Sequence, residues 1–155
     1  MKTLSFLFFV LITPFFMGFT AYSQELTPEQ KEKIMSEITT VFEKSIQAAE
    51  SLDGKLLADC VDDRLQAGFI INGNFFRSFT EVMADFEKNA VGCKAQKMNI
   101  INKKVTVLGE NAALFTASGD YSLELEDGRT LTGKFAYTMV YSNVNGNWKI
   151  IHSHM

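Results

Sequence analysis

The chain has little proline, little cysteine and no run of basic residues. Two of its 155 residues are proline, 46% are hydrophobic and 21% are charged. This composition is typical of a globular protein, and the length suggests a single domain. The formal net charge of -3 and the lack of a basic run argue against electrostatic binding of nucleic acid. A glycine-rich phosphate loop and a Gly-x-Ser-x-Gly elbow are also missing.

The N-terminus has the pattern of a secretory signal peptide. Lys2 supplies a short positive start, the segment 4–19 is almost wholly apolar, and Ala21-Tyr22-Ser23 forms a small-x-small cleavage pattern. An uncleaved membrane anchor is the alternative, but the apolar run is short for a span and Pro14 interrupts it. We therefore expect residues 1–23 to be a signal peptide and residues 24–155 to form a periplasmic or secreted domain without membrane contact after cleavage.

The two cysteines, Cys60 and Cys93, lie in or just after separate helical patterns. Disulfides persist outside the cytoplasm, so one bridge is conceivable for an exported protein. Nothing in the sequence brings the two residues together, and we favour two separate thiols. With no histidine near either cysteine, zinc binding is not expected.

Three helices are predicted in the first half of the domain. Thr27 and Gln30 form a capping box, and Pro28 suits the first position of a long helix. Its apolar residues recur every three or four positions: Ile34, Ile38, Val41, Phe42, Ser45, Ala49 and Leu52. Its charged residues, which include Glu37 and Lys44, are interpreted as a solvated face. A short helix follows from Leu56 to Val61, and a third helix begins after Ser78 and ends near Gly92.

From Lys97 onward the hydrophobic period changes to two, which predicts antiparallel strands. A three-residue loop, Glu126-Asp127-Gly128, would pair Leu123 with Leu131, Tyr121 with Gly133 and Gly119 with Phe135. A two-residue turn there would mix the two faces of the sheet, so we prefer the longer loop with Gly128 in a left-handed conformation.

The last hairpin favours a two-residue Asn145-Gly146 turn, which pairs Val144 with Asn147 and Tyr141 with Ile150. Continued without interruption, this register places Met139 opposite His152 and Tyr137 opposite His154. One face of the hairpin would then carry Phe135, Tyr137, Met139, Tyr141, Ile150, His152 and His154. The order of elements predicts an α+β fold, in which a cone-shaped, curved antiparallel sheet wraps around the long N-terminal helix, with three helices in all.

These features resemble the nuclear transport factor 2-like superfamily, in particular its SnoaL-like branch. The most specific part is the terminal stretch 145–154, in which a tryptophan precedes His-x-His. This stretch is also similar to the association domain of calcium/calmodulin-dependent kinases. The resemblance implies a cone-shaped barrel with a pocket, frequently a homodimer, in a superfamily that contains both enzymes and non-catalytic modules.

The ketosteroid isomerase type resembles this chain around Ala58 to Asp63, but its catalytic residues do not match. The general base of that type would fall near Gly68 or Phe69, and its tyrosine donor near Phe42. That proton-transfer mechanism is therefore disfavoured.

The candidate catalytic residues are His152, His154, Tyr137 and Asp63. A pocket histidine could act as a general acid or base, and a tyrosine could donate to a developing oxyanion. Asp120, another possible acid, points away from the Tyr121 face by strand parity. The alternative is that both histidines are structural. A His-x-His pair could also bind metal, but no third ligand has an obvious spacing, so neither a metal nor a cofactor is predicted.

Three functions remain open from sequence alone. We favour an exported pocket that binds a small, mostly apolar ligand without chemistry. The others are a lyase or isomerase that uses a pocket histidine and tyrosine, and a homodimerisation or interaction module. The predicted ligand-binding residues are Phe69, Ile71, Phe135, Tyr137, Met139, Tyr141, Trp148, Ile150, His152 and His154.

Overall fold

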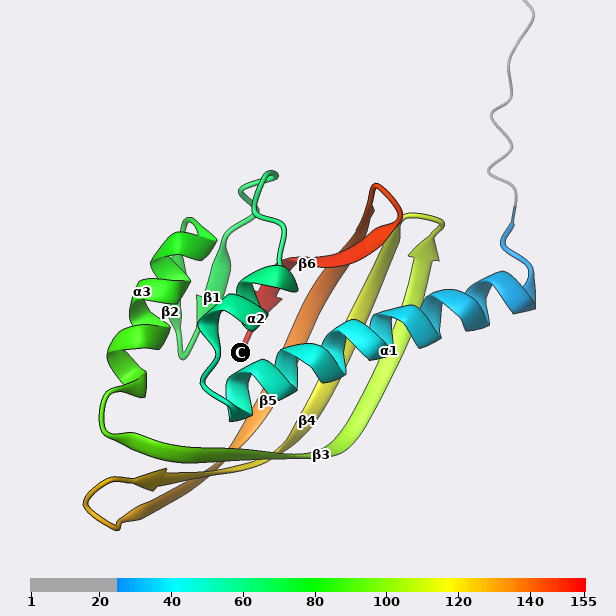
Figure 1. Ribbon diagram of the computed structural model, residues 1–155. Coiled ribbons are helices and arrows are strands. Elements are labelled where there is room, and N and C mark those ends of the chain that lie inside the picture. Colours follow the sequence, from blue (N-terminus) through cyan, green and yellow to red (C-terminus); the bar gives the residue numbers. More distant parts are fainter. Residues whose placement is uncertain (1–24) are drawn as a thin grey trace, which may run out of the picture.

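A computed structural model describes residues 25–155, which form three helices and one six-stranded sheet (Figure 1). The expected signal peptide, residues 1–23, lies outside the described residues. The elements in chain order are α1 (Pro28–Glu50), α2 (Gly54–Asp59), β1 (Phe69–Ile71), β2 (Asn74–Phe76), α3 (Phe79–Ala90), β3 (Cys93–Gly109), β4 (Ala112–Leu125), β5 (Thr130–Val144) and β6 (Asn147–His154). None of the helices described combines the length and apolarity needed to cross a membrane.

The predicted starts of α1 and α3 agree with the structure because their capping residues act locally, whereas α2 spans Gly54–Asp59 rather than the predicted Leu56 to Val61. Thr27 accepts a hydrogen bond from the Gln30 backbone, and the Gln30 side chain accepts one in return, which completes the capping box of α1. Ser78 accepts the Glu81 backbone N–H at the start of α3. Gly92, two residues after α3, has a φ of 78° and lets the chain turn back into β3.

The sheet has the order β2-β1-β6-β5-β4-β3. Its strands are antiparallel except that β1 runs parallel to β6, which differs from the wholly antiparallel sheet expected from sequence. A parallel pair needs a long crossover, and the chain between β1 and β6 supplies one because it contains α3 and the three longest strands. The fold is thus the predicted α+β cone, with a mixed sheet curved around α1 (Figure 1).

The β4–β5 register is the one predicted. Leu123 pairs with Leu131, and Gly119 with Phe135. The backbone N–H of Leu125 donates to the Arg129 carbonyl across the three-residue loop, and Gly128 has a φ of 85°. The hydrophobic alternation of β4 and β5 therefore determined which side chains face the helix.

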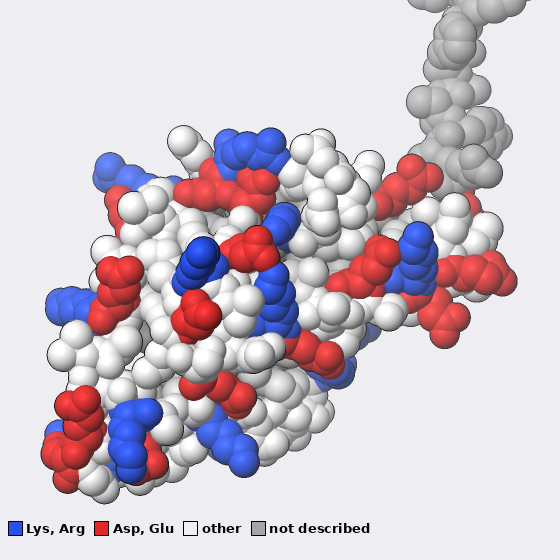
Figure 2. All heavy atoms as spheres, viewed as in Figure 1, with Lys and Arg blue, Asp and Glu red and all other residues white. Residues whose placement is uncertain are grey.

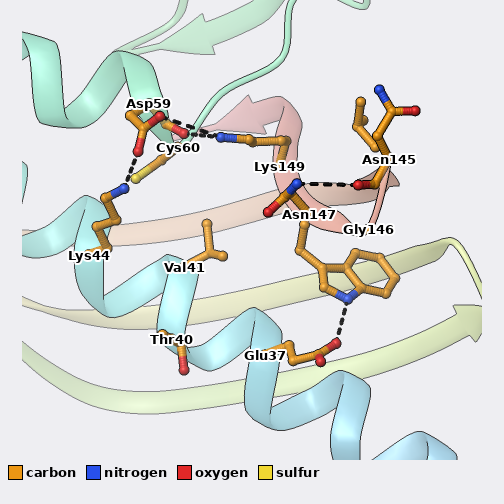
Figure 3. Close-up of a pocket in the computed structure, with 12 residues that line it drawn as sticks. Glu37, Thr40, Val41, Lys44, Asp59, Cys60, Asn145, Gly146, Asn147 and Lys149 are labelled. Carbon is orange, nitrogen blue, oxygen red and sulfur yellow. Dashed lines mark hydrogen bonds and ion pairs between the residues drawn. The ribbon is translucent and has the colours of Figure 1, made fainter.

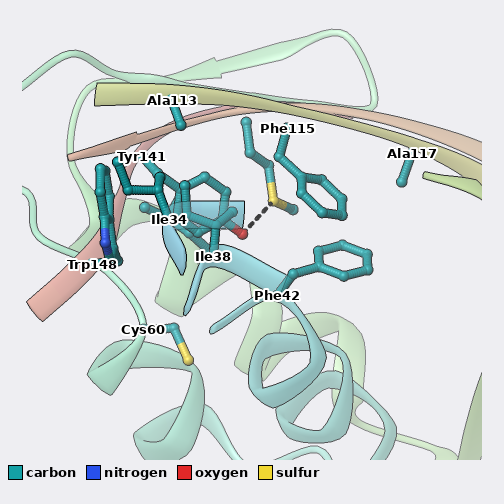
Figure 4. Close-up of a cluster of buried hydrophobic side chains, with 11 residues drawn as sticks. Ile34, Ile38, Phe42, Cys60, Ala113, Phe115, Ala117, Tyr141 and Trp148 are labelled. Atoms are coloured by element: carbon teal, nitrogen blue, oxygen red, sulfur yellow. Dashed lines mark hydrogen bonds between the residues drawn. The ribbon is translucent and has the colours of Figure 1, made fainter. Parts of the chain in front are cut away.

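The core lies between α1 and the concave face of β4, β5 and β6 (Figure 4). The rings of Phe42 and Phe115 stack with their centroids 4.2 Å apart, and Tyr141 packs edge-on against Phe115 at 6.2 Å. All three side chains are almost completely buried. Aromatic side chains from α1, β4 and β5 thus fill the space between α1 and the middle of the sheet.

Candidate functional site

The terminal hairpin begins as predicted and then departs from the predicted register. Val144 pairs with Asn147, and Tyr141 with Ile150, around an Asn145-Gly146 turn with positive φ at both residues. A bulge at the next position then shifts the pairing by one residue. Val140 pairs with His152, Met139 with Ser153 and Thr138 with His154.

This bulge corrects the predicted face of the two histidines. Beyond it, Ser153 is the buried residue opposite Met139, while His154 is exposed. A single extra residue inverts the alternation of a strand, and no pattern in the short segment Ile150-Ile151-His152 signals it. His152 and His154 therefore pair with Val140 and Thr138, on the face opposite Met139 and Tyr141.

Two candidate catalytic residues, His152 and Tyr137, and the neighbouring Tyr141 each have a partner of their own. Nδ1 of His152 lies 2.8 Å from the Gly68 carbonyl, which can only accept, so Nδ1 carries the proton. The hydroxyls of Tyr137 and Tyr141 donate to the sulfur atoms of Met98 and Met139, at 3.7 and 3.5 Å. Burial raises the pKa of both hydroxyls, so both remain protonated near neutral pH.

Asp63, the candidate acid, is tied to the start of α3. Its Oδ2 accepts the backbone N–H of Phe79 at 2.6 Å, and its Oδ1 is buried without a hydrogen-bond partner in the described part of the chain. A carboxylate at this end of a helix satisfies a free backbone donor and interacts favourably with the helix dipole.

The predicted ligand-binding residues fall into three groups. The buried ones are Phe69, Met139, Tyr141, Trp148 and Ile150; the half-buried ones are Ile71, Phe135, Tyr137 and His152; and His154 is exposed. Trp148 is the member of this set that lines the larger groove described next. Phe135 and Tyr137 pack on each other on the concave face of β5, with ring centroids 4.8 Å apart.

An open groove lies between α1, the end of α2 and the tip of the β5–β6 hairpin (Figure 3). Its volume is about 640 Å³. Val41, Val144 and the Trp148 ring supply apolar surface, while Thr40 and the turn at Gly146 form parts of its rim. A groove of this size falls within the range that holds small molecules.

Charged side chains stand at two places in this groove. Towards α2, Lys44 of α1 hydrogen-bonds Oδ2 of Asp59, and Lys149 of β6 donates to the backbone carbonyl of Asp59. Away from α2, Oε2 of Glu37 accepts the indole N–H of Trp148 at 3.0 Å (Figure 3). The hydrogen bond from Lys44 and the charge of Lys149 lower the pKa of the Asp59 carboxyl, so Asp59 is ionised at neutral pH.

Sequence reasoning assigned Glu37 and Lys44 to a solvated face and did not single out Asp59. The sequence does indicate that the groove residues of α1 lie together. Glu37, Thr40, Val41 and Lys44 follow the i, i+3, i+4, i+7 spacing of one helix face. Nothing local connects this face to Asp59 or Lys149, which reach the groove only through the tertiary fold.

A second, smaller pocket of about 410 Å³ lies on strands β3, β4 and β5. Asp120, Lys134 and Asn99 occupy neighbouring positions across three strands there. The described residues contain no group of three metal-ligating side chains placed to hold an ion. On the face shown in Figure 2, acidic and basic side chains are interspersed, without a large patch of one sign.

The family model described as the calcium/calmodulin dependent protein kinase II association domain matches residues 34–155. The chain belongs to this association-domain family. The matched segment includes α1 from Ile34 onward, the whole sheet and the groove. No curated protein is significantly similar to the chain in sequence.

Solved structures show that this association-domain family member has the nuclear transport factor 2-like fold, as predicted. A superfamily protein from Salmonella enterica is 17% identical and has a TM-score of 0.73, with 80% of this chain and 90% of that chain covered. A protein from Xanthomonas campestris, titled a putative calcium/calmodulin dependent protein kinase II association domain, is 21% identical and has a TM-score of 0.66, with coverages of 76% and 83%. A putative dehydratase of the same superfamily from Streptomyces avermitilis is 15% identical and has a TM-score of 0.69, with coverages of 80% and 95%.

Proposed function

We propose that this protein is an exported domain that binds a small, mostly apolar ligand in the groove between α1, α2 and the β5–β6 hairpin, without transforming it. The observation that carries the proposal is the groove itself, with a volume of about 640 Å³ and an apolar strip formed by Val41, Val144 and Trp148. Small-molecule sites commonly have this size and combine apolar walls with a few polar groups.

The position of Trp148 supports the proposal. The side chain is 5% exposed, and its indole N–H is held by Glu37 at 3.0 Å, so the ring is fixed in one orientation. A rigid aromatic surface loses little conformational entropy when a ligand packs on it. The pairing of Trp148 with an acid on α1 thus supports a preformed binding surface.

The arrangement of the candidate catalytic residues supports binding over lyase or isomerase chemistry. Proton transfer needs a base within hydrogen-bond reach of an acid or substrate. His152 is bonded to a backbone carbonyl, Tyr137 donates to a methionine sulfur, and Asp63 caps α3. All three lie outside the groove. The geometry therefore supports ligand binding in the groove better than it supports catalysis by these residues.

The ligand proposal is tested with a substitution that fills the groove. Thr40 is exposed on α1 and lines the groove, so Thr40→Phe reduces its volume without entering the core. Ser36→Phe, at an exposed position one turn earlier and outside the groove, is the matched control. The readouts are native mass spectrometry of the protein from its own periplasm and binding of the neutral fluorophore N-phenyl-1-naphthylamine. We expect wild type and Ser36→Phe to bind and Thr40→Phe to lose binding; equal binding by all three would reject the groove as the site.

Export is the part of this proposal that rests on residues 1–23. The test is the N-terminal sequence of the protein recovered from the periplasm or medium, which we expect to begin near Gln24. A protein that keeps its leader and remains with the membrane would contradict export.

Homodimer formation is a second candidate function, favoured by the description of the matching family as an association domain. Strand β3 lies at the edge of the sheet, where its free backbone groups could pair with a second copy, and Ile101 and Leu108, at two of its β-bulges, are 58% and 61% exposed. Analytical ultracentrifugation of the purified protein should give the mass of a dimer. A monomer at all concentrations tested would remove this candidate.

A further inference from the structure

The end of the groove near α2 combines two ammonium groups with one carboxylate. Lys44 hydrogen-bonds Oδ2 of Asp59, and the Nζ atom of Lys149 lies 3.7 Å from Oδ1 of the same residue. Of the charged residues that line this end, two are positive and one is negative. Glu37, the other acid of the groove, is engaged with Trp148 and lies 3.8 Å from Lys33. At the α2 end itself, two ammonium groups surround one lining carboxylate, and Asp62, outside the lining, also interacts electrostatically with Lys149.

Both ammonium groups also retain hydrogen-bonding capacity. An ammonium has three N–H donors. The hydrogen bonds formed within residues 25–155 use one donor of Lys44 and one of Lys149. The two side chains reach the groove from opposite walls, one from α1 and one from β6, with Asp59 between them (Figure 3). A single anionic group beside Asp59 can accept donors from both walls.

The aliphatic stem of Lys149 is held in place more firmly than that of an ordinary surface lysine. Its side chain is 26% exposed, compared with 63% for Lys94 and 77% for Lys33, which also take part in ion pairs. Its bond to the backbone carbonyl of Asp59 fixes the ammonium group without neutralising its charge. The groove therefore presents a positioned cation next to the apolar strip of Val41, Val144 and Trp148.

We infer that the groove takes an anionic amphiphile, a small carboxylate with an apolar body, whose carboxylate is bound by Lys44 and Lys149 while its apolar body packs on Trp148. This inference rests on the proposed ligand-binding function and specifies the chemical class of the ligand. Asp59 keeps both lysines oriented, and their remaining ammonium N–H donors distinguish an acid from a neutral molecule of equal size. Charge-assisted hydrogen bonds of this kind are stronger than neutral ones.

The test compares octanoate with octanol, which has the same chain length and no charge, and with acetate, which has the charge and almost no apolar body. Each competes with N-phenyl-1-naphthylamine for the full-length mature protein, and the emission of Trp148, the single tryptophan in the chain, reports occupancy directly. We expect octanoate to bind about tenfold more tightly than octanol, the ratio that about 1.4 kcal/mol of charge-assisted bonding provides. Acetate should bind far more weakly than either, and added salt should reduce the preference for octanoate.

Two variants test whether Lys44 and Lys149 cause the preference for octanoate over octanol. Lys149→Met and Lys44→Met each keep an aliphatic stem and remove the charge, and each should bring octanoate down to the affinity of octanol. Lys103→Met is the matched control, because Lys103 forms a comparable ion pair with Glu43 at 3.2 Å outside the groove. If Lys149→Met does not fold, as judged by circular dichroism, Lys44→Met alone decides. An unchanged preference in the folded variants would overturn the inference.

The outcomes separate the inference from the proposed function. Equal binding of octanoate and octanol, both lost in Thr40→Phe, would overturn the inference and leave the apolar binding site intact. No binding of either compound, with no change in Trp148 emission, would overturn both.

Discussion

The indole N–H of Trp148 donates a hydrogen bond of 3.0 Å to Oε2 of Glu37, and the two residues are 111 positions apart in the chain. This bond joins the start of the last strand to the middle of α1 and fixes one wall of the groove. The bond also connects two residues that look unrelated in the sequence. One is the single tryptophan, in a strand, and the other is a glutamate on the charged face of a helix.

Removal of this acceptor should cost stability. Glu37→Ala leaves a nearly buried indole N–H without its partner, and we expect the free energy of unfolding to fall by about 1 kcal/mol, with part of the full cost offset by water because Glu37 is half-exposed. Urea unfolding followed by Trp148 fluorescence measures the change. Glu43→Ala on the same helix is the control, since its exposed ion pair with Lys103 should contribute less than about 0.5 kcal/mol. Equal losses of unfolding free energy in the two variants would show that the indole hydrogen bond contributes no more than an exposed ion pair.

The Phe42–Phe115 stack should be the most sensitive point of the core. Both side chains are at most 1% exposed, and their ring centroids are 4.2 Å apart. Phe42→Ala would leave a large cavity between α1 and β4, and we expect a loss of about 3–5 kcal/mol in the free energy of unfolding. Met35→Ala on the same helix, where the side chain is 37% exposed, should lose far less. Thermal unfolding by circular dichroism distinguishes the two, and similar melting temperatures would contradict the assigned core.

Two glycines in the curved part of the sheet should respond differently to alanine. A Cβ at Gly119 would overlap the backbone carbonyl oxygen of Asn99 and approach the Phe135 ring at 2.8 Å, so the β3–β4 pairing itself would have to move. A Cβ at Gly133 would meet the Tyr121 ring at 2.6 to 2.7 Å, but that ring is 36% exposed and can swing away. We expect Gly119→Ala to destabilise the protein by about 3 kcal/mol or to prevent folding, and Gly133→Ala by about 1 kcal/mol. The reverse order in urea unfolding would contradict this packing.

The sequence predicted most of the fold because its strongest signals are local. The capping box at Thr27, the left-handed Gly128 and the alternation of Leu123 with Glu124 each act within a few residues, and each agrees with the structure. The β-bulge before His152 could not be predicted, because it inserts one residue into an otherwise regular apolar strand.

The groove could not be predicted from the sequence, for a different physical reason. Its walls are contributed by α1, α2 and two strands, so its charge balance depends on tertiary distances that no residue spacing encodes. Trp148 was the one predicted ligand-binding residue that the fold placed there. Lys44 has the helical spacing of a groove residue, but the same spacing also describes an ordinary solvated face.

The two cysteines should differ strongly in reactivity. Both are free thiols, but Cys60 is 1% exposed and donates a hydrogen bond to the Leu56 carbonyl, whereas Cys93 is half-buried at the start of β3. Burial raises the pKa of the Cys60 thiol, because the thiolate would lose its hydration, and the thiolate is the form that reacts. The fraction of Cys60 ionised at mildly alkaline pH is therefore smaller than that of an ordinary thiol.

Iodoacetamide should modify Cys93 first, and peptide mass spectrometry at successive times measures both rates. We expect alkylation of Cys60 to be at least about tenfold slower in the native protein, because its raised pKa lowers the thiolate fraction and its burial limits access of the reagent. The rates should become similar in urea, where the pKa shift and the burial are both lost. Cys93→Ser provides the control, since the native variant should then take up label only at the slow rate. Fast native labelling of Cys60 would place its thiol in contact with solvent and contradict its burial against β6, where its carbonyl accepts the Ile150 backbone N–H.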